Sequence, residues 1–92
     1  MVVDVRKQTL AILDEVLSLN GRARAYGRAT PLLGAVPELD SMAVVGVITA
    51  LEEHFGFVID DHEIDASIFA SVGSLVDFVA GKLKHPGSAG HA

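Results

Sequence analysis

The sequence has no cysteine among its 92 residues, so it can form neither a disulfide framework nor a thiolate metal site. It also has no long hydrophobic run. The longest, residues 42–51, is interrupted by Gly46 and Thr49 and is about half as long as a membrane span. The first residues show no basic segment leading into an apolar one, as a secretory signal would. We therefore expect a soluble, cytoplasmic protein with no membrane span.

The chain is also short, and its charge is unevenly distributed. A length of 92 residues allows one domain with a single modest core, too small for a deep catalytic cleft. The net charge of −5 combines a balance of +2 over residues 1–37 with −7 over residues 38–92. An acidic surface repels phosphate backbones, so we expect no nucleic-acid binding. The acids suit partners with basic docking surfaces, or they only keep the domain soluble.

Two long helices are predicted in the first 56 residues. Apolar residues recur every three to four positions over residues 4–19, and Asn20 followed by Gly21 is expected to end this helix. A second helix is predicted over residues 41–55, with Asp40 as its N-cap and Gly56 as its stop. The long connection between them, residues 22–39, is of a length that tends to be functional or mobile. Its adjacent leucines, Leu32 and Leu33, are expected to fold back and seal the core.

The second half of the chain predicts the rest of a helical bundle. Residues 57–59 are apolar but have no partner strand, so we expect an extended loop packed into the core. Asp65 is the expected cap of a short helix, and Ser71 of a last long one. The fold class is therefore all-α: a small four-helix bundle of three long helices, with one short helix between helices two and four. The domain covers residues 1–84, and residues 85–92 are expected to be disordered.

The most informative residue is Ser41, at the point where a loop becomes a helix. A serine that attacks by itself needs a base to remove its proton, and no histidine lies near Ser41 in the sequence. A serine modified by another enzyme needs only exposure and a fixed backbone. The four histidines show no metal-ligand spacing. We therefore expect no catalytic residue, no metal ligand and no enzyme activity of the chain's own.

Three blocks of sequence give the chain a family resemblance. Residues 39–42 (Leu-Asp-Ser-Met), 51–56 (Leu-Glu-Glu-His-Phe-Gly) and 69–75 (Phe-Ala-Ser-Val-Gly-Ser-Leu) occur in order. Together they resemble the acyl carrier protein family, including its peptidyl and D-alanyl carriers, over about residues 4–84. Within that family the motif around Ser41 looks closest to D-alanyl-type and specialised carriers, including those beside exopolysaccharide systems.

The resemblance implies that the chain carries rather than catalyses. A phosphopantetheinyl transferase would attach 4′-phosphopantetheine from coenzyme A to Ser41. An acyl or aminoacyl group would then be held on the arm as a thioester. The expected further partners are an acyl- or aminoacyl-activating ligase and a downstream acyltransferase or synthase of fatty acid, polyketide or exopolysaccharide biosynthesis. A monomer is expected, because a carrier must visit several enzymes.

The second helix departs from the family in its first turns. Many fatty-acid carriers have several acids there, whereas this chain has only Asp40, with Glu38 just outside. We expect partner recognition by Asp40 and Glu38 and by the apolar residues Met42 and Val45, through a drier interface. Alternatively, Met42 and Val45 pack into the core or under the long loop. A rival function is a binding module that is never modified and acts through the apolar face of this helix.

Three arginines in the connection also depart from the family's usual acidic tendency there. They could bind an acidic partner, fold back to pair with Glu38 and Asp40, or remain solvated with only weak surface pairs. The sequence does not choose among these alternatives for Arg22, Arg24 and Arg28.

Overall fold

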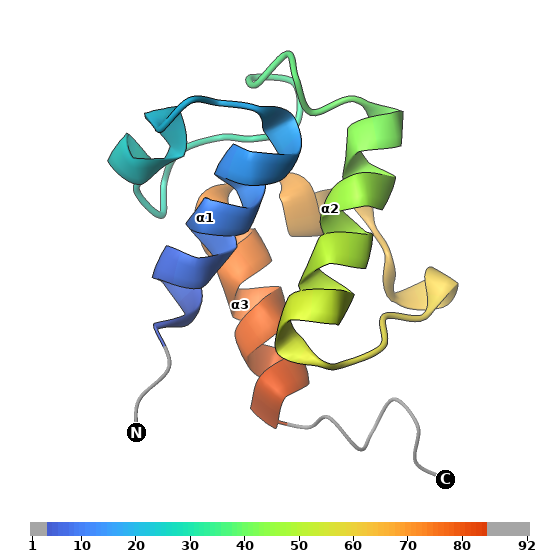
Figure 1. The fold of residues 1–92 in the computed structure, drawn as a ribbon. Coiled ribbons are helices and arrows are strands. Elements are labelled where there is room, and N and C mark those ends of the chain that lie inside the picture. Colours follow the sequence, from blue (N-terminus) through green and yellow to red (C-terminus); the bar gives the residue numbers. More distant parts are fainter. Residues whose placement is uncertain (1–3, 85–92) are drawn as a thin grey trace, which may run out of the picture.

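A computed structural model describes residues 4–84 of the chain. Three α-helices, α1 (Val5–Leu17), α2 (Ser41–Phe55) and α3 (Val72–Lys84), form the bundle. In Figure 1, α1 and α2 stand side by side with α3 crossing behind them. Short 3₁₀ turns lie between the helices: η1 (Arg22–Ala25), η2 (Asp61–Glu63) and η3 (Ala66–Phe69). The expected all-α class is confirmed, but the short helix expected before α3 is the 3₁₀ turn η3 rather than an α-helix.

The core lies where the apolar faces of the three α-helices meet. α1 contacts both α2 and α3. It approaches α2 closely at Gly46, where an added Cβ would lie 3.3 Å from a methyl group of Val16. This close approach of the two helices therefore explains why α2 has a glycine in its middle, despite the cost of glycine to helix stability. The buried apolar residues of the helices are Leu10, Ile12, Leu13 and Leu17 of α1, Val47 and Leu51 of α2, and Val72, Leu75, Val76 and Val79 of α3.

The first helix is shorter than expected. It ends at Leu17, and Ser18 adopts the left-handed conformation (φ 54°) that we expected only at residues 20 and 21. In this early turn the backbone N–H of Leu19 donates a hydrogen bond to the carbonyl of Asp14 (3.0 Å), and the Leu19 side chain is completely buried. Burial of one leucine therefore sets where the helix stops, although Gly21 (φ 89°) also has positive φ as predicted.

The connection between α1 and α2 is anchored on the start of α3. Backbone N–H groups of Val72 and Gly73, which have no partner inside their own helix, donate to the carbonyls of Thr30 and Arg28 (both 2.9 Å). The backbone N–H groups of Leu32 and Leu33 donate to the carbonyls of residues 70 and 69, respectively. Leu32 is fully buried as expected, but Leu33 is 42% exposed and does not seal the core. Leu33 belongs to a turn over residues 33–35, in which the backbone N–H of Val36 donates to the carbonyl of Leu32 (2.8 Å) and the Leu33 side chain is left outside.

The segment between α2 and α3 begins with residues that alternate between buried and exposed. Phe57 and Ile59 are buried and Val58 is exposed, which confirms the extended loop expected over residues 57–59. Asp65 precedes η3 but its carboxylate accepts from the Ser67 hydroxyl instead of capping the backbone of a helix. Ser71 does act as a cap, because its hydroxyl accepts from the backbone N–H of Ser74 (3.2 Å). No helix within residues 4–84 is long and apolar enough to cross a lipid bilayer.

A partly buried ion pair ties η2 to α3. The ammonium group of Lys82, a residue only 7% exposed, donates to both carboxylate oxygens of Glu63 (2.9 and 3.0 Å). Glu63 also accepts from the backbone N–H of Asp60, and this hydrogen bond, followed by that from Lys82, lowers the pKa of Glu63 below its usual 4.5. A carboxyl group with a lowered pKa in the folded state stabilises the fold above its ordinary pKa. That contribution disappears as the pH falls through the lowered value.

We expect Glu63→Gln to reduce the free energy of unfolding at pH 7 by about 1–3 kcal/mol, because the Lys82 charge loses its partner. The variant should also lose less stability than the wild type as the pH falls below 4.5, the ordinary pKa of the group. Urea unfolding at pH 7 and at pH 3 measures both effects. Glu53→Gln, which changes an exposed residue of α2, is the matched control. Equal losses for the two variants would contradict a stabilising role for the pair.

Candidate functional site

The residues around Ser41 are held in place by one buried side chain and one helix cap. Leu39 is 4% exposed and anchors the end of the long connection in the core. Asp40 is extended (φ −97°, ψ −175°), and its carboxylate accepts from the backbone N–H of Ala43 at 2.8 Å. α2 then begins at Ser41 and ends at Phe55, followed by Gly56 with positive φ (76°), so both predicted ends of this helix are confirmed. Ser41 itself is exposed and lies on a fixed backbone.

The surroundings of Ser41 suit modification better than self-activation. The side-chain hydroxyl makes no hydrogen bond to any residue between 4 and 84, and the neighbouring Asp40 carboxylate is engaged in the cap. His54 lies 13 residues further along the same helix, which is roughly 20 Å at 1.5 Å per residue. Its ring is within hydrogen-bond distance of Gln8 (2.7 Å). Within residues 4–84, no histidine is hydrogen-bonded to the Ser41 hydroxyl.

Glu38, predicted to recognise partners, is engaged within the protein. Its carboxylate accepts from the Arg22 guanidinium at 2.6 Å, and this hydrogen bond holds the pKa of Glu38 below its ordinary value. Arg22 also donates to the carbonyl of Leu19 (3.0 Å), just beyond α1. The end of α1 is thus linked to the residues that precede Ser41.

The other two arginines of the connection have separate roles. Arg28 pairs with Asp77 of α3 (2.9 Å), and Arg24 has no ion-pair partner within residues 4–84. The alternative that these arginines pair with Glu38 and Asp40 is correct only for Arg22 and Glu38. Asp40 instead caps α2.

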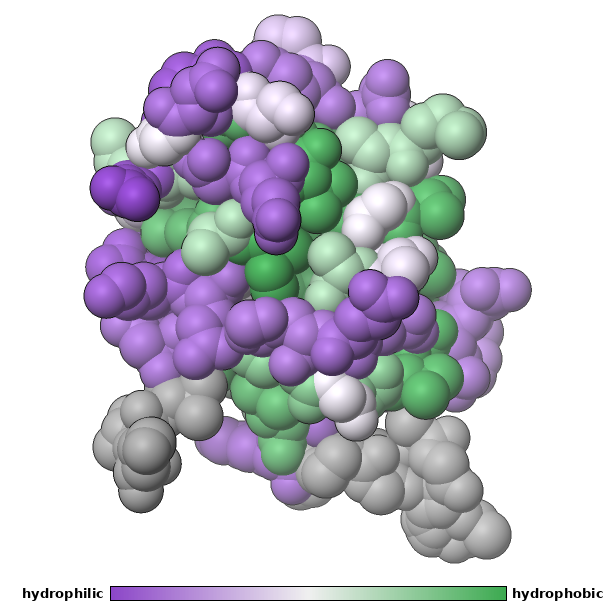
Figure 2. Space-filling model, viewed as in Figure 1, coloured by the Kyte–Doolittle hydropathy of each residue, from purple (hydrophilic) through white to green (hydrophobic). Residues whose placement is uncertain are grey.

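Met42 and Val45 form an exposed apolar surface beside Ser41. They are 79% and 61% exposed, so the alternative that they pack into the core or under the loop is wrong. Figure 2 shows this apolar surface where the first half of α2 reaches the outside of the molecule. The structure also exposes Val58 and Ile64, which the sequence reasoning did not single out. For Val58 the signal was available, because it stands between two residues that the extended loop buries.

Residues 4–84 contain no group of three or more acidic, histidine or cysteine side chains close enough to hold a metal ion. The start of α2 is better suited to a covalently attached phosphate. The backbone N–H groups of its first turn lie at the positive end of the helix dipole. A phosphodiester on Ser41 would be stabilised there by roughly 0.3–1 kcal/mol, while the Asp40 charge would oppose it.

Comparison with solved structures gives a match over most of the chain. The chain is similar to a holo acyl carrier protein from Nitrosomonas europaea, solved by NMR in solution, with 49% sequence identity and a TM-score of 0.84. The match covers 90% of this chain and 100% of that one. No protein-family model matches the chain, and a search of curated proteins finds no match either.

Proposed function

The chain belongs to the acyl carrier protein family, and we propose that it carries an acyl or aminoacyl group on a 4′-phosphopantetheine arm attached to Ser41. The observation that carries this proposal is the exposed Ser41 at the first position of α2, in a chain 49% identical to a holo carrier. The arm supplies a terminal thiol that holds the cargo as a thioester. This gives a chain without cysteine its sulfur chemistry.

The residues of this chain position the Ser41 hydroxyl and do not activate it for attack. Asp40 and Leu39 fix the backbone on the N-terminal side of Ser41, so the hydroxyl is presented to another protein at a defined place. On the transferase, the Ser41 oxygen would bond to phosphorus while the phosphoanhydride of coenzyme A breaks and adenosine 3′,5′-bisphosphate leaves. The hydroxyl proton would leave to a base of the transferase, and Mg²⁺ would be held mostly by the transferase.

We further propose that Met42 and Val45 contact the enzymes that visit Ser41, with Asp40 contributing its charge. Two exposed apolar side chains next to the attachment serine favour an interface from which water is excluded. Glu38 can contribute only by sharing its carboxylate with Arg22. The enzymes concerned are the phosphopantetheinyl transferase, an activating ligase for the acyl or aminoacyl group, and an acyltransferase or synthase. Catalysis resides in these partners, and we propose that a cytoplasmic monomer moves between them.

The test is the intact mass of the wild-type chain after incubation with coenzyme A, Mg²⁺ and a promiscuous phosphopantetheinyl transferase. We expect the gain of one phosphopantetheine group. A Val45→Glu sample, followed over time beside the wild type, is expected to be modified more slowly because a charge replaces apolar contact area. A wild-type rate for Val45→Glu would remove Val45 from the transferase interface without affecting the carrier role.

The second candidate function is an unmodified binding module, favoured by the 79% and 61% exposure of Met42 and Val45. It predicts that protein purified from its native host has the mass of the unmodified chain. The carrier predicts the added mass of the arm on at least part of that protein. Native mass therefore separates the two functions even if the test transferase does not accept this chain.

A further inference from the structure

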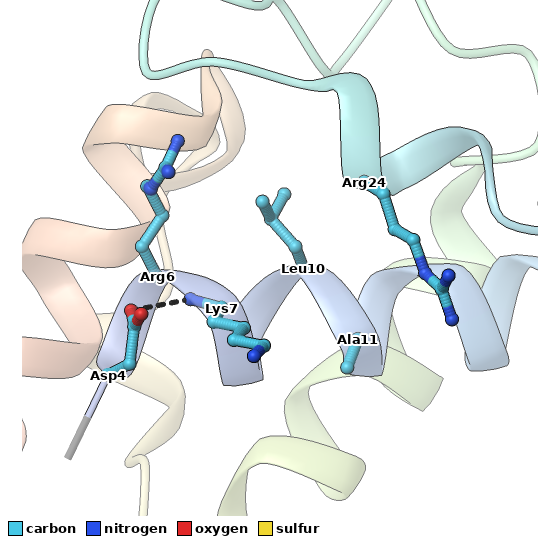
Figure 3. Close-up of a pocket in the computed structure, with 6 residues that line it drawn as sticks. All are labelled: Asp4, Arg6, Lys7, Leu10, Ala11 and Arg24. Carbon is cyan, nitrogen blue, oxygen red and sulfur yellow. Dashed lines mark hydrogen bonds between the residues drawn. The ribbon is translucent and has the colours of Figure 1, made fainter.

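The basic side chains of this acidic protein divide into two groups. Three of them, Arg22, Arg28 and Lys82, form ion pairs within the fold. Lys84, at the end of α3, forms no ion pair within residues 4–84, and neither do the other three, Arg6, Lys7 and Arg24. These last three line one hollow of about 590 Å³ between α1 and η1, together with Asp4, Leu10 and Ala11 (Figure 3). Three of the four cations that form no ion pair within residues 4–84 are thus gathered on one surface, which we call the basic hollow.

The positions of these cations are set by the backbone. Arg6 and Lys7 lie on the first turn of α1, where the carboxylate of Asp4 accepts from the backbone N–H of Lys7 (3.0 Å). Arg24 belongs to η1, which is held against α1 because the Asp14 carboxylate accepts from the N–H groups of residues 21 and 23 (3.1 and 3.2 Å). The single carboxylate in the hollow is therefore engaged in a helix cap, and the hollow has a net positive charge.

The arrangement favours a protein segment over a small anion. In Figure 3 the head of Arg6 points away from those of Lys7 and Arg24, and Leu10 and Ala11 separate Lys7 from Arg24. A single phosphate is bound best by donors that converge on it, whereas spread charges around an apolar floor match several carboxylates flanking an apolar side chain. The hollow lies on α1 and η1, and Ser41 lies at the start of α2, across the molecule from η1 in Figure 1.

We propose that the basic hollow is a second docking surface, which binds an acidic segment of a protein partner. Its charge is opposite to that of residues 38–92, where the net charge is −7. The hollow would therefore select partners with an acidic surface, whereas the acids of residues 38–92 would select partners with a basic one. Because the cations are exposed, binding through the hollow is weak and depends on ionic strength.

The proposal is tested by NMR with the full ¹⁵N-labelled chain and a short peptide of glutamates around one leucine. We expect amide shifts concentrated on residues 6–11 and 23–25, which weaken between about 20 mM and about 0.5 M salt. The double variant Arg6→Gln/Arg24→Gln is expected to bind the peptide roughly fivefold more weakly or worse. Lys84→Gln, which removes an exposed cation at the end of α3, should change the affinity less than about twofold.

Control ligands and variants test whether binding depends on the carboxylates of the peptide and on the basic hollow. The same peptide with glutamines in place of glutamates should produce no shifts, and equal shifts would overturn the proposal. Shifts of these amides by inorganic pyrophosphate but not by the peptide would assign the hollow to a small anion and also overturn it. So would equal weakening by Lys84→Gln and by Arg24→Gln alone, since each removes one charge and binding would then follow net charge alone. Circular dichroism confirms that the variants are folded.

Discussion

Ser41→Ala is expected to abolish the mass gain of one phosphopantetheine that we expect for the wild-type chain. Without the hydroxyl there is no oxygen at the start of α2 to bond to phosphorus. The substitution should leave the fold intact, because Asp40 supplies the cap and Ser41 is exposed. We expect its free energy of unfolding to stay within about 0.5 kcal/mol of the wild type. Intact mass spectrometry measures the loss, and thermal unfolding measures the stability.

A second serine provides the control for this prediction. Ser67 is exposed, and its hydroxyl donates to Asp65 near η3, away from the start of α2. Ser67→Ala should therefore gain the same mass as the wild type. If Ser41→Ala were still modified, the arm would be attached at another hydroxyl, and peptide mass mapping would locate it. That result would leave the family membership intact and remove Ser41 as the site.

Leu51→Ala is expected to reduce the free energy of unfolding by about 2–5 kcal/mol. The Leu51 side chain is 1% exposed and holds the second half of α2 in the core. Truncating it removes buried apolar surface and leaves a cavity that the surrounding helices fill only in part. Domains of this size have a total stability of only about 5–15 kcal/mol, so the loss is a large fraction of the whole. Urea unfolding followed by circular dichroism measures it.

The matched control for Leu51→Ala is an exposed residue of the same helix. Val45 is 61% exposed, so Val45→Ala should change stability by no more than about 0.5 kcal/mol. Similar losses for the two substitutions would mean that α2 does not pack through the face that buries Leu51. The apolar surface formed by Met42 and Val45 would then no longer be free for partners.

Signals from residues close together in the sequence predicted both ends of α2. Asp40 before an apolar run and Gly56 after it fixed both ends of α2, because a cap and a left-handed stop act within a few residues. The same signals failed at α1. There Ser18 ends the helix so that Leu19 can be buried, and burial is decided by the rest of the core.

The candidate site was also predictable from the sequence only in part. The sequence indicated Ser41, because its place at a helix start beside an acid can be read from a few residues. It left open whether Met42 and Val45 face solvent, because an apolar residue beside the buried stripe of a helix is compatible with either side. The packing of α2 against α1 at Gly46 and Val16 determines which face of the helix is buried.

By itself, the sequence determined the all-α class, the bounds of α2, the exclusion of thiol chemistry from the chain's own residues and the candidate serine. Only the tertiary structure decided which charges are paired. Arg22 meets Glu38, Arg28 meets Asp77 and Lys82 meets Glu63, whereas Arg6, Lys7 and Arg24 remain around one hollow. The paired residues are far apart in the chain, and no local pattern brings them together. Burial of the core fixes how the helices pack, and that packing determines which charged side chains become neighbours.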